Sequence, residues 1–82
     1  MLFTELVPGQ SFYVGDTRVL LHRKQGHMVY VSVDKVEKEL YPGDAFELPG
    51  SVIMVRKKFG RRARFSIDAD DSVKVSFESI NK

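Results

Sequence analysis

Apolar and polar residues alternate along much of the chain, most clearly near its C-terminal end. Residues 63–68 read Ala-Arg-Phe-Ser-Ile-Asp, and residues 73–78 read Val-Lys-Val-Ser-Phe-Glu. A period of two places the apolar side chains on one face, which is typical of half-buried strands. Residues 68–72 lie between the runs, and Asp and Ser favour turns because their side chains bond the nearby backbone. The sequence therefore predicts two strands joined by a turn, with Val73, Val75 and Phe77 pointing inward.

The rest of the chain predicts further short strands, separated by Pro-Gly and Gly-Asp turns. The expected strands are residues 3–7, 11–14, 18–22, 28–34, 36–41, 45–48 and 52–55, and the expected charged loops are residues 23–27 and 56–60. The consecutive apolar residues of 18–22 favour a strand covered on both faces, with a short buried helix as the alternative. No segment shows the three-to-four spacing of an amphipathic helix over three turns.

The two halves of the sequence align without a gap at an offset of 34 residues. The alignment contains nine identities, and they include the turn-forming pairs Pro8-Gly9 and Pro42-Gly43. We interpret this as an internal duplication, with repeat one at 1–34, repeat two at 35–68 and a tail strand within 69–82. The alternative is that small β proteins reuse similar turns at similar intervals.

These patterns together predict one all-β domain spanning residues 1–82. We expect a small barrel or sandwich of short, mostly antiparallel strands, without a substantial helix. Two copies are too few for a solenoid. They suit a pseudo-twofold arrangement, in which each copy covers the apolar face of the other.

Composition narrows the class of protein further. The chain has 82 residues and no cysteine, so neither a disulfide nor a thiolate metal site supports a small and marginally stable core. No apolar run approaches the length of a membrane span, and the first residues lack the basic start of a signal peptide. We therefore expect a cytoplasmic protein that does not enter a membrane.

Basic residues are concentrated in one part of the chain. The formal net charge is only +2, but six basic residues fall between positions 56 and 64, namely Arg56, Lys57, Lys58, Arg61, Arg62 and Arg64. Such a cluster suits the binding of phosphates, because arginine and lysine neutralise them and release counterions. Phe59 lies within the cluster, where it either stacks on an unpaired base or packs into the core.

Several short motifs of this chain also occur in a known family. They are Met1-Leu2, Gly9-Gln10, Gly15-Asp16, Gly60 and the stretches 63–69 and 73–80. In these motifs the chain resembles the carbon storage regulator family, whose small bacterial members bind GGA-bearing RNA hairpins and regulate translation. Units of that family pair as interleaved homodimers, in which the first and last strands of one subunit join the partner's sheet. The resemblance implies a comparable arrangement within this single chain, with an mRNA or a small RNA as its partner and Ala69 and Val73 at the binding edge.

The chain departs from the family at the basic positions that bind RNA. The first-strand positions carry Leu6 and Val7, the second copy carries Leu40 and Tyr41, and the late arginine position carries Phe77. The alternative function is therefore a protein-interaction module that keeps the fold and has lost the RNA site. Its partner would be a second copy of the chain or another protein, and its interface residues would be Leu6, Val7, Tyr41 and Phe77.

The sequence offers little support for metal binding or catalysis. Calcium loops need a glycine and a closing glutamate at fixed spacing, which Asp68, Asp70 and Asp71 lack. His22 and His27 have no third ligand spaced near them. No Ser-His-Asp arrangement or phosphate-binding glycine loop can be argued. We therefore expect no metal, no cofactor and no enzymatic activity, and we favour an RNA-binding translational regulator.

Overall fold

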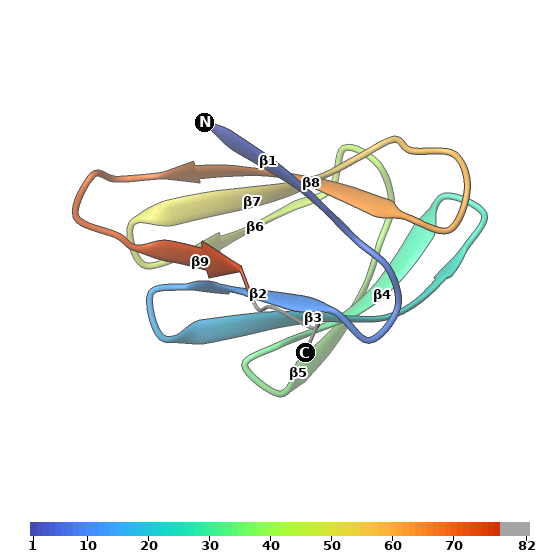
Figure 1. Cartoon of the computed structure of the whole chain (residues 1–82), viewed down its shortest axis with the longest axis horizontal. Helices are drawn as coiled ribbons and strands as arrows, with labels where there is room; N and C mark the ends of the chain where they lie inside the picture. The colour runs from blue at the N-terminus through green and yellow to red at the C-terminus, as the bar shows by residue number, and fades with distance from the viewer. Residues whose placement is uncertain (78–82) are drawn as a thin grey trace.

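The computed structural model describes residues 1–77 and confirms the all-β prediction. The described chain forms nine strands and no helix. The strands make two antiparallel sheets that lie face to face (Figure 1). Glu78, Ser79 and Ile80, which belong to the predicted tail and to the motifs of the resemblance, lie outside the described residues.

The first sheet, here called sheet A, has four strands. They are β1 (Leu2–Leu6), β6 (Ala45–Leu48), β7 (Ser51–Arg56) and β8 (Ala63–Ala69). Their order across the sheet is β1-β8-β7-β6. The bounds of β6 agree with the expected strand 45–48, because Gly43 and Gly50 take positive φ values of 95° and 74° and form the turns on either side.

The second sheet, here called sheet B, has five strands. They are β2 (Ser11–Val14), β3 (Thr17–Gln25), β4 (Met28–Val33), β5 (Val36–Leu40) and β9 (Val75–Phe77). Their order is β5-β4-β3-β2-β9. In sheet B, β9 pairs with the outer side of β2. In sheet A, no described strand pairs with the outer side of β6, which holds the place of β2.

Each sheet combines strands from both halves of the sequence. β1 pairs with β8, β5 pairs with β4, and β9 pairs with β2. The bounds of β1 and β5 lie 34 residues apart, and so do those of β2 and β6. The internal repeat stays a prediction, and the equal spacing of these strands agrees with it.

The hydrophobic core lies between the two sheets. Phe12 of sheet B and Phe65 of sheet A are both fully buried, and their rings meet edge to face with centroids 5.6 Å apart. Valine and isoleucine side chains from β3, β4 and β7 surround them. The alternating pattern therefore works as predicted, since the inward residues of both sheets meet in one core.

One predicted loop is wrong. The sequence predicts a charged loop at residues 23–27, but β3 continues to Gln25, and only Gly26 and His27 connect it to β4. The register of β3 and β4 shifts between Leu21 and Arg23, which marks a β-bulge at His22. A bulge reverses which residues face inward, so the alternation in this segment does not look like one continuous strand.

The prediction that residues 18–22 are covered on both faces is also wrong. Val19 and Leu21 are fully buried, but Arg18 and His22 are exposed and Leu20 is only partly buried. Sheet B packs on sheet A through one face only, so its other face meets solvent. The run of apolar residues reflects one partly covered leucine rather than a second layer of structure.

The inward direction predicted for the last strand is confirmed. Phe77 stands opposite Phe12 in the ladder, and their ring centroids are 6.4 Å apart. Phe77 is nevertheless 51% exposed, because β9 is an edge strand and has no neighbour on its outer side within the described chain. Alternation gave the direction of the side chain but not the depth of its burial.

Candidate nucleic-acid interface

Two arginines stand side by side on the outer face of sheet A. Arg56 ends β7 and lies directly opposite Arg64 of β8 in the strand register. Their neighbours Val55 and Phe65 are buried in the core, so alternation turns both arginines outward. Like charges directly opposite each other destabilise a sheet unless something compensates them.

An exposed aromatic ring lies beside this pair of arginines. Phe3 of β1 is 48% exposed, and the guanidinium carbons of Arg64 and Arg56 lie 5.0 and 5.7 Å from its ring centroid. Both distances suit cation–π contacts. Phe3, Arg56, Lys57 and Arg64 line a hollow of about 350 Å³. The hollow offers three cations and a ring face, which are groups that bind phosphates and bases.

Sequence reasoning did not identify Phe3 as a site residue. The alternation of β1 shows only that Phe3 faces away from Leu6, which is buried. The pairing of β1 with β8 brings the ring next to the arginines, since Phe3 stands opposite Ser66. This contact joins residues that are about sixty positions apart, and no local signal reports it.

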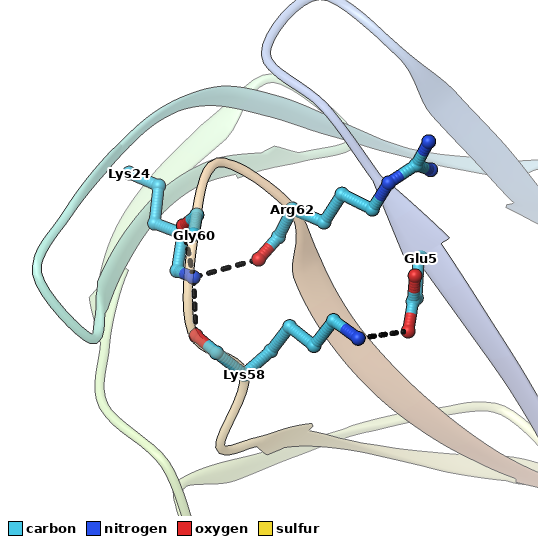
Figure 2. Close-up of polar contacts among 5 residues, drawn as sticks. All are labelled: Glu5, Lys24, Lys58, Gly60 and Arg62. Atoms are coloured by element: carbon cyan, nitrogen blue, oxygen red, sulfur yellow. Dashed lines mark hydrogen bonds and ion pairs between the residues drawn. The ribbon is translucent and has the colours of Figure 1, made fainter.

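A lysine from sheet B holds the basic loop in place. Residues 57–62 connect β7 and β8, and the ammonium of Lys24 donates hydrogen bonds to three of their carbonyls. It contacts Lys58 O, and it lies 2.7 Å from both Gly60 O and Arg62 O (Figure 2). An ammonium group has three donors, so these bonds use all of them.

Lys24 reaches the loop because of the β-bulge in β3. After the shift in register, Lys24 stands opposite Val29, which is buried, and therefore lies on the inner side of sheet B. From there its side chain spans the end of the sandwich. Burial and the neighbouring Lys58 ammonium lower the pKa of Lys24 below its usual value of 10.5.

The loop also contacts the first strand. The ammonium of Lys58 lies 3.2 Å from a carboxylate oxygen of Glu5. Figure 2 shows the Lys58 side chain reaching toward Glu5, while the Arg62 side chain extends away from Lys24. The charge of Lys58 is thus partly neutralised by Glu5. Arg61 and Arg62 of the same loop are exposed to solvent.

Phe59 does not pack into the core. It is 75% exposed and lies in the loop, with its ring edge to face with His27 at 5.1 Å and with Lys57 Nζ 5.5 Å from its centroid. Of the two alternatives that the sequence left open, the exposed ring between cations is the one observed. Phe59 is therefore a second exposed ring suited to stacking, and it contacts Lys57, which lines the hollow beside Phe3.

The other two predicted RNA-binding residues lie at the opposite end of β8. Ala69 and Val73 line a separate hollow of about 240 Å³, together with Leu2, Asp70 and Asp71. Ala69 lies five positions after Arg64, which corresponds to about 17 Å at the usual rise of about 3.4 Å per residue. The predicted set therefore divides into a basic surface and an apolar hollow with acidic groups, joined by one strand.

The residues proposed for a protein interface do not form one surface. Leu6 is 4% exposed and belongs to the core, so its assignment to an interface is wrong. Val7 is partly buried. Tyr41 follows β5 and Phe77 lies on β9, at the two opposite edges of sheet B. Leu6 is buried because β1 pairs with β8, and this pairing turns the Leu6 side chain into the space between the sheets.

Across residues 1–77, no three His, Asp or Glu side chains are grouped closely enough to hold a metal ion. Within the same range no helix is long and apolar enough to cross a membrane. Asp68 ends up within β8, and Asp70 and Asp71 lie in the turn that follows it.

Comparison with known proteins does not identify the chain. No model of a protein family matches it, no curated protein matches it, and no solved structure matches it. The resemblance to the carbon storage regulator family stays a prediction from the motifs.

Proposed function

We propose that this protein is a non-catalytic RNA-binding regulator that acts on translation in the cytoplasm. The observation that carries the proposal is the pair Arg56 and Arg64, placed opposite each other on an open sheet face beside the ring of Phe3. A phosphate between the two guanidinium groups would offset their repulsion, and the exposed rings suit unpaired bases. The RNA segment bound would therefore be single-stranded.

The arrangement of the strands agrees with the resemblance on which the regulatory part of this proposal rests. The resemblance implies that first and last strands cross to the other unit, and β1, β5 and β9 each pair with a strand from the other half of the chain. The binding surface proposed here differs from the family's, because Leu6 is buried and Phe77 replaces an arginine. The cations lie instead on β7, β8 and their connecting loop.

The test is an RNA titration at two salt concentrations with a charge-matched pair of variants. In the Arg56→Gln/Arg64→Gln variant we expect at least tenfold weaker binding of a short single-stranded RNA. The slope of log affinity against log salt should also fall by about 0.7, since the variant loses one phosphate contact and each contributes about 0.7. The Lys38→Gln/Lys74→Gln variant removes the same charge elsewhere and should retain the parent slope.

Two results would count against this function. If the arginine variant binds RNA as tightly as the parent, the surface is misassigned. If the parent binds neither single-stranded RNA nor RNA hairpins at low salt, the RNA-binding proposal fails.

A further inference from the structure

The basic surface of sheet A is formed by Phe3, Arg56 and Arg64. Sheet B carries a surface at the equivalent place. Phe3 of β1 stands opposite Ser66, and Arg64 lies two residues before Ser66. In sheet B, Glu37 of β5 stands opposite Ser32, and Tyr30 lies two residues before Ser32. Glu37 thus occupies the place of Phe3, and Tyr30 occupies the place of Arg64.

The bulge in β3 completes the equivalence. Because His22 is displaced from the ladder, Arg23 stands opposite Tyr30, as Arg56 stands opposite Arg64. The surface of sheet B therefore retains one of the two cross-strand arginines. Without the bulge, His22 would fill that place.

The chemistry of the two surfaces is nevertheless different. The Tyr30 hydroxyl donates a hydrogen bond to Glu37, and the Arg23 guanidinium covers the Tyr30 ring at 4.5 Å from its centroid. The His22 ring lies 5.6 Å from the same ring. Glu39 stands directly opposite Tyr30, as Glu5 stands opposite Arg64 in sheet A, where Glu5 is paired with Lys58. On sheet A the ring of Phe3 contacts two arginines, whereas on sheet B the ring carries a hydroxyl that is bonded to a carboxylate.

We propose that the protein holds one RNA-binding surface, and that Glu37 is the residue that closes its counterpart on sheet B. This inference rests on the proposed function. A phosphate approaching Arg23 meets the carboxylates of Glu37 and Glu39, and their negative charges repel it. The ring that could stack on a base is covered by Arg23 on one side and tied to Glu37 through its hydroxyl. A pseudo-symmetric sandwich thus binds its ligand asymmetrically.

The test is the number of RNA molecules bound per chain. The probe is a fluorescein-labelled single-stranded RNA of seven nucleotides, titrated at protein concentrations far above the dissociation constant. The parent should bind one RNA per chain. The Glu37→Phe/Tyr30→Arg variant restores the aromatic and the second arginine, and should bind two. The Asp16→Asn/Glu47→Gln variant gains the same two charge units at other exposed positions and should still bind one.

Glu37→Gln provides a second measurement that keeps the shape of the side chain. It removes the carboxylate charge and should allow a second, weaker RNA to bind at low salt. The fold of each variant is checked by its thermal unfolding transition.

The possible outcomes test the single surface, the role of Glu37 and the proposed function separately. A parent that binds two RNAs overturns the inference but leaves the proposed function standing. A well-folded double variant that still binds one RNA overturns the role of Glu37, as does binding of a second RNA by the charge control. A parent that binds no RNA overturns the proposed function itself.

Discussion

Lys24 and Gly60 belong to opposite sides of the sandwich, and the Lys24 ammonium donates a 2.7 Å hydrogen bond to the Gly60 carbonyl. Gly60 lies in the loop that carries Phe59, Arg61 and Arg62, and its φ of 90° favours glycine. The geometry of a basic loop in sheet A thus depends on a lysine that a bulge in sheet B turns inward.

Replacing Lys24 with methionine should loosen this loop without unfolding the sandwich. The change removes three hydrogen bonds to carbonyls at a partly solvated site. We expect a loss of about 1–2 kcal/mol of unfolding free energy, measured by urea denaturation. Amide hydrogen exchange of residues 58–62 should accelerate more than that of β8.

Lys38→Met is the matched control, since Lys38 is a partly buried lysine on β5. It should leave the exchange of residues 58–62 unchanged. Equal acceleration in both variants would show that the Lys24 bonds do not hold the loop.

The turn between β4 and β5 should be improved by glycine. Asp34 and Lys35 have φ values of 50° and 71°, so both central residues of this two-residue turn are left-handed. A turn of this type prefers glycine at its second position, where lysine is strained. Lys35→Gly should stabilise the protein by about 0.5–1 kcal/mol and raise its melting temperature by about 4 °C.

Lys35→Ala is the control for this prediction. Alanine has a Cβ and gains no conformational relief, so its melting temperature should not rise. A lower melting temperature for the glycine variant would mean that the side chain of Lys35 contributes more than its strain costs.

Truncation of Leu6 should affect stability rather than association. Leu6 is 4% exposed within the core, so Leu6→Ala should cost about 2–4 kcal/mol in urea denaturation. Tyr41 is 55% exposed, and Tyr41→Ala should change stability by less than about 0.5 kcal/mol. Equal small effects in both variants would contradict the inward position of Leu6.

The phenol of Tyr30 should titrate at higher pH than an ordinary tyrosine. Its hydrogen bond to Glu37 is the main cause that raises its pKa above the usual 10.0, followed by burial and by the negative charge of Glu37. Because the folded pKa is the higher one, this contribution to stability is complete below pH 10 and is lost as pH rises through the raised pKa.

Absorbance at the phenolate band measures this titration. The chain has three tyrosines, so the Tyr30→Phe variant identifies which step belongs to Tyr30. Glu37→Ala should return that step toward the usual value. An unchanged titration in Glu37→Ala would show that the hydrogen bond is not its cause.

Much of the secondary structure could be predicted from the sequence. The strands 11–14 and 45–48 were placed with their observed bounds, because Pro-Gly and Gly-Asp turns enclose them. The bulge at His22 was missed, since an extra residue changes the period of alternation without leaving a turn signal. The extent of β3 was underestimated for the same reason.

The candidate site was predicted only in part. The cluster of cations and the exposed ring of Phe59 were visible, because they are neighbours in the sequence. Phe3, Lys24 and Glu37 were not identified as functional residues. Phe3 and Lys24 act through contacts with a strand or loop that is distant in the sequence, whereas Glu37 acts through Tyr30 on the adjacent strand of the same hairpin.

The sequence by itself determined which residues form strands, where most turns fall and which side chains face the core. Those properties follow from alternation and from the backbone preferences of single residues. Only the tertiary structure decided which strands are neighbours, because every half-buried strand presents the same apolar face and can pair with several others. The pairing of β1 with β8 and of β5 with β4 placed Phe3 beside Arg64 and Glu37 beside Tyr30. Because the two pairings are equivalent, the difference between the two faces arises from the residues at the paired positions, Phe3 and Arg64 in sheet A and Glu37 and Tyr30 in sheet B.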